Sequence, residues 1–440
     1  MLPEDSRNFV VNEWFNSHWQ RYKQHILISP DSFEKNYTTQ YTPQYTPQQS
    51  NTQSQNRLEA KRNHISKPFQ SVGQLGDTLK DISSSDYYFR YGSSIERELR
   101  RTLTHLEVGY AQNNQDHLDT TIHNSGMSAI SSLVLALRKK IPNAQDLKFM
   151  VGANSYQDTK NFFEYIVPTL GFGPSIFVEV NNLESISTPL MYNPNKIIAF
   201  ICENLSSPYM EYTNIRQLTT LVQSYNVPLI IDATLLPAFL QQPFRLGADI
   251  VIRSMTKYES GQGDIKAGSL TGPKQVIQEI RQMQRYVDTL PSITELISFQ
   301  ERLTTLPERL HQHLDNLQEM KKFLETHPLI ERTYYPMPLE SVRYAQPGGM
   351  LSFQFKGTPQ EKETREKNLM QQLINHNHYP ISYEVSFGSQ KWSMLGLSTL
   401  GITSITQPNH YPPGLVRVAI GREPSASQVI SFLEKILREI

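Results

Sequence analysis

A lysine flanked by two hydroxyl residues stands in the segment DIVIRSMTKYESGQGDIKAG, residues 249–268. The apolar run at its start predicts a strand that delivers Ser254, Thr256 and Lys257 at its carboxyl end. Ligands of parallel α/β sheets lie beyond this end of the strands, so we expect Lys257 at a ligand-binding edge. An amine there suits a Schiff base with an aldehyde, and the hydroxyls suit hydrogen bonds to a phosphate. Taken alone, such a lysine is more often an ordinary surface residue.

Two further segments place polar groups where a cofactor could meet them. Asp232 follows the apolar run PLII, and a carboxylate there is costly unless it meets a cation such as the protonated pyridine nitrogen of pyridoxal phosphate (PLP). In HNSGMSAI, Ser125 opens a predicted helix, and the free N–H groups of Gly126 and Met127 would point at an anion. Each signal is weak by itself, since Asp232 could equally cap a helix or a turn.

In this order and spacing the three segments resemble the Cys/Met-metabolism family of PLP enzymes. That family includes cystathionine γ-synthases, cystathionine lyases, methionine γ-lyases and acyl-homoserine sulfhydrylases, and the resemblance covers about residues 86–440. The family signature S-x-T-K-Y-x-x-G-H-x-D-x-x-x-G is matched by Ser254, Thr256, Lys257, Tyr258, Gly261, Asp264 and Gly268. Gln262 replaces the histidine of the signature. The resemblance implies that PLP is held as a Schiff base on Lys257.

The resemblance also implies roles for residues outside the signature. YFRYG is similar to a family segment that crosses a dimer interface, so Tyr88 and Arg90 would bind the partner's PLP phosphate. Tyr156 of NSYQDT would stack on the cofactor ring and act as an acid or base near the leaving group. Arg417 of GLVRVAIGRE would clamp the substrate α-carboxylate, with Ser386 of YEVSFGS as a second contact, although GLSTLGITS could be aligned there instead.

Arg417 has support that does not depend on the resemblance. An arginine between apolar strand neighbours needs a buried anion, and a carboxylate would supply one. The sequence also departs from the family at ENLSSP, where the family has E-x-P-S-N-P. Ser207 stands in place of the asparagine that hydrogen-bonds the PLP phenolic oxygen, and a serine reaches less far. These departures leave the substrate undecided.

The elements that must position these residues alternate between short β-branched runs and helical periods, which predicts a doubly wound, mostly parallel α/β domain. The resemblance implies the PLP-dependent transferase fold type I. The candidate strands cover 118–124, 148–154, 175–180, 196–203, 228–234 and 249–255. A long helical stretch over 293–327, interrupted at Pro307, leads to a smaller α+β domain.

We expect three parts along the chain. Residues 1–85 form an extension whose polar tract, about 37–57, has too few aliphatic residues to offset the entropy of ordering. Residues 86–310 form the large PLP-binding domain, and residues 311–440 form the small domain.

The composition of the 440-residue chain excludes several classes of protein. Lys plus Arg and Asp plus Glu both number 42, so no global field attracts nucleic acid or an anionic membrane. The single cysteine, Cys202, excludes an intrachain disulfide and cysteine-based metal sites, and it fits a reducing, cytoplasmic setting. We expect no signal peptide, no membrane span and no metal site. A plain nucleotide-binding protein is disfavoured because Walker and dinucleotide glycine patterns are missing.

From the resemblance we expect a cystathionine γ-synthase-like homodimer or homotetramer acting on an amino acid. Its reaction would replace the γ-substituent of an activated homoserine with cysteine or another thiol. Two alternatives stay open. The first is a cystathionine or methionine lyase, or a specialised γ-substituting biosynthetic enzyme. The second is a catalytically silent scaffold that keeps the fold.

Overall fold

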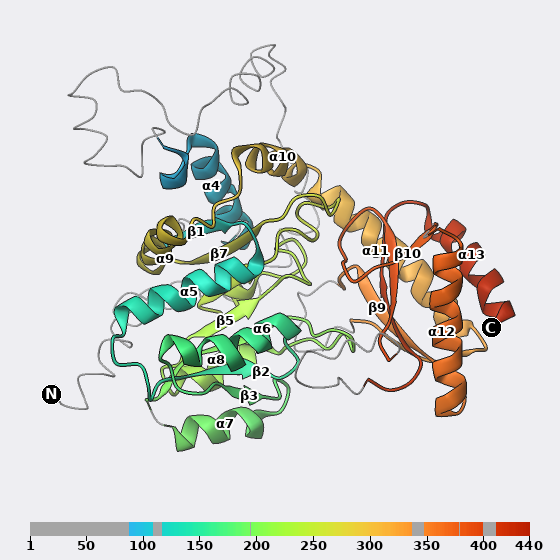
Figure 1. Cartoon of the computed structure of the whole chain (residues 1–440), viewed down its shortest axis with the longest axis horizontal. Helices are drawn as coiled ribbons and strands as arrows, with labels where there is room; N and C mark the ends of the chain where they lie inside the picture. Colours follow the sequence, from blue (N-terminus) through green and yellow to red (C-terminus); the bar gives the residue numbers. More distant parts are fainter. Residues whose placement is uncertain (1–87, 109–116, 194, 337–346, 378, 399–410) are drawn as a thin grey trace, which may run out of the picture.

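The structure, a computed structural model, describes residues 88–108, 117–193, 195–336, 347–377, 379–398 and 411–440. The predicted extension over 1–85 and its polar tract lie outside these residues. Figure 1 shows a large body built on one sheet and a smaller body that carries the C-terminus. The helix that joins them, α11 (Leu306–Thr326), runs from one body into the other.

The large body is built on a seven-stranded sheet with the order β1-β7-β6-β5-β4-β2-β3. Five of its strands, β2 to β6, run parallel, and antiparallel β7 joins them to β1. Its strands are β1 (Leu118–His123), β2 (Lys148–Gly152), β3 (Ile176–Val178), β4 (Ile197–Glu203), β5 (Leu229–Asp232), β6 (Ile250–Arg253) and β7 (Gly268–Pro273). The predicted α/β class is confirmed.

Helices cover both faces of this sheet, which explains why its central strands β4, β5 and β6 are nearly continuous apolar runs. Ile230 and Ile252 pack in one core with α5 and α9, whereas Ile231 and Val251 pack in a second core with α7 and α8. The helices and short helical turns of this body are η3 (Phe89–Tyr91), α4 (Ser94–Val108), α5 (Gly126–Lys140), α6 (Gln157–Asn161), η5 (Phe162–Ile166), η6 (Pro168–Leu170), α7 (Leu183–Tyr192), α8 (Ile215–Gln223), η7 (Pro243–Leu246), α9 (Lys274–Val287) and α10 (Ile293–Leu303).

The smaller body has a five-stranded sheet with the order β10-β11-β12-β9-β8 and helices packed against it. Its elements are β8 (Ile330–Tyr334), β9 (Met350–Phe355), α12 (Pro359–Asn375), β10 (Ile381–Tyr383), β11 (Trp392–Gly396), β12 (Leu415–Ala419) and α13 (Ala426–Glu439). Pro307 lies in the first turn of α11, where its missing N–H costs nothing, so the predicted interruption separates α10 from α11. Leu310 of α11 packs in the core of the large body and Leu317 in that of the smaller one.

The described residues contain no helix that is long and apolar enough to cross a membrane. They also contain no group of three or more His, Cys, Asp or Glu side chains placed to hold a metal ion.

Candidate active site

Lys257 lies in the turn that follows β6, at the carboxyl edge of the large sheet. Its Nζ donates a hydrogen bond of 3.1 Å to Ser386 Oγ and lies 4.8 Å from the centre of the Phe387 ring. Burial, together with the positive charge of Arg417, lowers the pKa of Lys257 from its ordinary value. A lysine with a lowered pKa is more often a neutral amine, and the neutral amine is the form that attacks an aldehyde or takes a proton.

A glycine in the smaller body lets its loop close on the lysine. Gly388 has a φ of +76°, and a Cβ atom there would lie 2.7 Å from the backbone nitrogen of Tyr258. Only glycine satisfies both the conformation and the close approach. Ser386 is held in this loop because its carbonyl accepts a 3.1 Å hydrogen bond from Ser393 Oγ. The structure thereby brings Ser386 to Lys257, although 129 positions separate them in the sequence.

Arg417 lies in β12, between β11 and β9, and its guanidinium donates to the carbonyl of Val385. Burial lowers the pKa of Arg417 to about 10, so the side chain stays positive at neutral pH. Its charge acts on Lys257 and Tyr156. A half-buried cation beside a lysine and a tyrosine forms a site for a small anion such as an amino-acid carboxylate.

Asp232 lies at the end of β5, and its Oδ1 accepts hydrogen bonds from the backbone N–H (3.0 Å) and the hydroxyl of Thr234. Burial raises the pKa of Asp232, because the charged form is poorly solvated. A cation that reaches Oδ2 would stabilise the carboxylate, and the protonated ring nitrogen of PLP has the required charge. The carboxyl group therefore fits the cofactor.

The start of α5 packs against the strand that carries Lys257. Ser125 caps this helix by accepting a 3.0 Å hydrogen bond from Ser128 N, and the two residues form a capping box. A Cβ atom on Gly126 would lie 3.1 Å from Ser254 Cβ, so the helix and the strand end are in close contact. The backbone N–H groups of Gly126 and Met127 open this helix, where a phosphate is favoured.

The hydroxyl of Thr256, predicted to contact the phosphate, also makes hydrogen bonds within the chain. Its hydroxyl donates to the carbonyl of Ala267 (3.2 Å) and accepts from the N–H of the same residue (3.0 Å). The hydroxyl proton is thus already used within the chain. Its role toward a phosphate stays a prediction.

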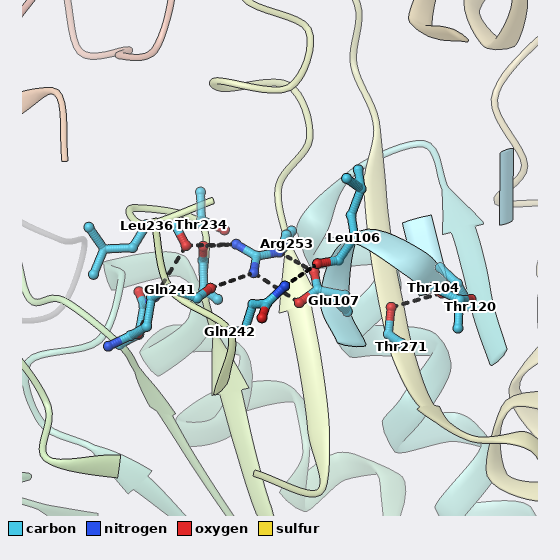
Figure 2. A network of polar contacts seen from close by, with 12 residues as sticks. Thr104, Leu106, Glu107, Thr120, Thr234, Leu236, Gln241, Gln242, Arg253 and Thr271 are labelled. Carbon is cyan, nitrogen blue, oxygen red and sulfur yellow. Dashed lines mark hydrogen bonds and ion pairs between the residues drawn. The ribbon is translucent and has the colours of Figure 1, made fainter. Parts of the chain in front are cut away.

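A buried arginine fixes the edge of the sheet immediately before Ser254 (Figure 2). The guanidinium of Arg253 forms an ion pair with Glu107 at the end of α4 and donates to the carbonyls of Ala233 (2.6 Å) and Leu236 (2.8 Å). These carbonyls belong to the turn that follows Asp232. One side chain therefore ties together the strand that leads to Lys257, the turn after Asp232 and helix α4.

The family model described as Cys/Met metabolism PLP-dependent enzyme matches residues 51–430. The chain belongs to this family of PLP-dependent enzymes. An L-methionine gamma-lyase of Fusobacterium nucleatum subsp. polymorphum is 26% identical over 84% of this chain and 91% of that protein. The chloroplastic cystathionine gamma-synthase 1 of Nicotiana tabacum is 26% identical over 66% of this chain and 52% of that protein.

Solved structures show the same fold. A cystathionine gamma synthase from Xanthomonas oryzae pv. oryzae has a TM-score of 0.70 with 20% identity, covering 85% of this chain and 91% of that one. A cystathionine gamma-lyase from Lactobacillus plantarum has a TM-score of 0.69 with 20% identity, covering 85% and 92%. Membership in the family identifies PLP as the cofactor and sulfur amino acids as the class of substrate.

Part of the family signature makes contacts within the chain around the lysine loop. Gly261 has a φ of +71°, and a Cβ atom there would collide with Arg309, whose guanidinium donates to the carbonyls of Tyr258 and Glu259 (2.9 Å). Asp264 forms an ion pair with Arg302 through two hydrogen bonds. Gln262, which replaces the family histidine, is exposed.

Tyr88 and Arg90 lie beside α9 of their own chain. Arg90 Nη1 donates a 3.1 Å hydrogen bond to the carbonyl of Arg285, and its guanidinium lies 5.2 Å from the centre of the Tyr88 ring. Among the contacts of the described residues, none joins Arg90 to Lys257 or Asp232. Their predicted role at a partner's site therefore stays a prediction.

Ser207 lies half-buried in the turn after β4, next to Ser206, whose N–H donates to the carbonyl of Glu211 (2.9 Å). Its predicted contact with the PLP phenolic oxygen is not tested by the contacts of this turn.

Two acidic residues near the site were missed by sequence reasoning. Glu203 ends β4 and pairs in register with Asp232 of β5, and its Oε1 accepts a 2.6 Å hydrogen bond from the N–H of Tyr156. Asp158 Oδ2 accepts a 2.8 Å hydrogen bond from the Tyr156 hydroxyl. The signal that indicated Asp232, an acid directly after a buried strand, is equally present in KIIAFICE and could have indicated Glu203.

Proposed function

We propose that this PLP-dependent enzyme replaces the γ-substituent of an activated homoserine with the sulfur of cysteine or another thiol. The observation that carries the proposal is the 3.1 Å contact between Lys257 Nζ and Ser386 Oγ, made beside Arg417. The contact supports the proposal because it places the Lys257 amine, whose pKa is lowered, between the cofactor edge of the large sheet and the Arg417 guanidinium, which suits a substrate carboxylate.

The side chains of this chain divide the work of binding and proton transfer. When bound, PLP supplies an electron sink that stabilises negative charge at the substrate Cα. Asp232 offsets the positive charge of the ring nitrogen, and Gly126, Met127 and Ser254 donate hydrogen bonds to the phosphate. Arg417 and Ser386 hold the α-carboxylate, which directs the Cα–H bond toward Lys257. Lys257 then takes the Cα proton and afterwards moves a proton at Cβ.

The overall replacement balances without an oxidant or a reductant. The Cγ–O bond of the activated homoserine breaks, and a Cγ–S bond forms with the thiol. The proton of the thiol leaves with the acyl carboxylate or phosphate. Tyr156 stands near Arg417 and is the residue that we assign to proton transfer at the leaving group.

The second candidate function is γ-elimination, in which the γ-substituent leaves with a proton, no thiol adds at Cγ, and water hydrolyses the remainder to ammonia and a keto acid. It is favoured by the methionine γ-lyases, which align with up to 84% of this chain. The specialised γ-substituting enzyme and the catalytically silent scaffold remain further alternatives.

Product analysis separates these functions. The purified enzyme with PLP is given O-acyl-homoserine or phosphohomoserine, with and without cysteine, and in parallel cystathionine and methionine. Thioether formation that requires the thiol supports replacement. Equal keto acid and ammonia with or without thiol contradicts replacement and favours elimination, and bound PLP without any turnover favours the scaffold.

We also infer a homo-oligomer, at least a dimer and by family resemblance a tetramer, because Tyr88 and Arg90 would complete the phosphate site of a partner. The lone, buried Cys202 is consistent with a reducing, cytoplasmic compartment.

A further inference from the structure

Two carboxyl groups from different elements hold Tyr156 at its main chain and at its side chain. Glu203, at the end of β4, accepts the backbone N–H of Tyr156 at 2.6 Å. Asp158, in the first turn of α6, accepts the tyrosine hydroxyl at 2.8 Å. Tyr156 is 56% exposed, so these two hydrogen bonds restrain it more than packing does.

Glu203 makes its contact as one member of a carboxyl pair. It is in register with Asp232, and neighbouring strands lie about 4.8 Å apart, too close for both groups to carry charge at low cost. Burial, and next the charge of Asp232, raises the pKa of Glu203 to about 8, while the amine of Lys160 acts in the opposite direction. A single proton on the pair therefore removes most of this cost.

Asp158 acts on the hydroxyl in a different way. Burial, and next the hydrogen bond and the charge of Asp158, raises the pKa of Tyr156 to about 12, and Arg417 opposes this shift. Glu203 raises the pKa of this phenol as well, but less than Asp158 does. At neutral pH the tyrosine is therefore a phenol, which can give a proton to a leaving group but cannot take one.

We propose that Glu203 and Asp158 are positioning residues that clamp Tyr156, Glu203 through the main chain and Asp158 through the hydroxyl, so that it serves as a proton donor. The proposal rests on the proposed function for the reaction that uses this proton. The clamp itself is a property of the chain, and it can be measured without turnover.

The main-chain half of the clamp is tested with Glu203→Ala, Glu203→Gln and, as a matched control, Glu211→Ala. Glu211 lines the same small pocket as Glu203 but is exposed, and its contact with Ser206 uses only its backbone carbonyl. Amide hydrogen exchange is followed in the segment 155–161 of the full chain without PLP. The dissociation constant of PLP and the visible circular dichroism of the bound cofactor are then measured in the same variants.

Glu203→Ala is expected to accelerate exchange at the Tyr156 amide and to weaken PLP about 3- to 10-fold, the effect of one lost hydrogen bond. Glu203→Gln keeps a neutral acceptor and should stay within about 2-fold of the wild type, as should the control. Unchanged exchange in Glu203→Ala, or a Gln variant as impaired as the Ala variant, overturns the proposal. If Glu203→Ala exchanges faster but the wild-type enzyme binds no PLP, the clamp is supported and the proposed function is contradicted.

The hydroxyl half is tested by a spectrophotometric titration of phenolate absorbance, taken as the difference between each protein and its Tyr156→Phe derivative. Asp158→Asn removes the charge and keeps an acceptor, and Glu164→Gln removes an exposed charge from the neighbouring turn as the control. The Tyr156 titration should move about one pH unit lower in Asp158→Asn, a tenfold change, and stay in place in the control. The alkaline limb of the kcat profile should move with it. No movement in Asp158→Asn, or an equal one in the control, overturns this half.

Discussion

Partial removal of the Arg417 guanidinium from water is costly. Its described hydrogen bond goes to a neutral carbonyl, which does not offset that cost as a negative charge would. The α-carboxylate of a substrate would supply the missing negative charge. Arginine suits this task better than lysine because two of its N–H groups can bind one carboxylate.

Replacing Arg417 therefore tests the substrate site. Arg417→Ala should raise KM about 10- to 100-fold, the loss of a charge-assisted contact of about 1.5–3 kcal/mol, and Arg417→Lys should recover only part. Steady-state kinetics measure the change. The control is Arg365→Ala, a half-buried arginine of α12 that donates to the carbonyl of Lys356. An unchanged KM in Arg417→Ala would exclude Arg417 from carboxylate binding.

Sequence patterns indicated which side chains stand at strand ends, but not all of their contacts. Asp232 could be found because it directly follows an apolar run, and Lys257 because it stands between hydroxyl residues shortly after another one. Ser386 was predicted, by resemblance, only as a contact to the substrate carboxylate; its hydrogen bond with Lys257 was not foreseen, since it depends on how the loop of the smaller body closes. The hydroxyl of Thr256 also bonds to Ala267 across the lysine loop, a contact that the spacing of residues does not indicate, and its role toward a phosphate stays a prediction.

At the scale of elements, Arg253 holds helix α4 and strands β5 and β6 in one arrangement (Figure 2). Both Arg253 and Glu107 are buried, so removal of one partner leaves a charge without compensation.

Glu107→Leu should lower the free energy of unfolding by about 3–5 kcal/mol. Urea unfolding of the enzyme measures this loss. The double variant Glu107→Leu with Arg253→Met should recover part of it, because the unpaired charge is gone. As the control, Asp264→Asn breaks the more exposed pair with Arg302 and should cost at most about 1 kcal/mol. Equal costs for the buried and the exposed pair would contradict the role assigned to the network.

The six candidate strands of the large sheet were found from their apolar runs, and the sheet contains all of them. Strand β7 was missed because its sequence, GSLTGP, begins with glycine and ends with proline, residues that usually mark turns. Its burial comes from its position between β1 and β6, which depends on the topology of the whole sheet. The boundaries proposed for the three parts of the chain stay predictions.

At the scale of the whole molecule, the proposed oligomer makes each site depend on two chains. Arg90 contacts Arg285 of its own α9, and we assign its free capacity for hydrogen bonds to the phosphate site of a partner.

Mixed oligomers test this dependence. Subunits with Arg90→Ala and subunits with Lys257→Ala should each be inactive or strongly impaired. A mixed dimer contains one complete site, made by Lys257 of one subunit and Arg90 of the other. Random mixing in equal amounts should therefore restore about a quarter of wild-type activity. If Arg90 served its own chain, mixing would restore nothing.

The most direct test of the central claim is to find which lysine carries PLP. The enzyme is loaded with PLP and reduced with borohydride, and the labelled peptide is identified by mass spectrometry. We expect the pyridoxyl group on Lys257, no label in Lys257→Ala, and full labelling in the control Lys266→Ala, an exposed lysine nearby. A label on another lysine, or equal labelling of Lys257→Ala, would contradict the account.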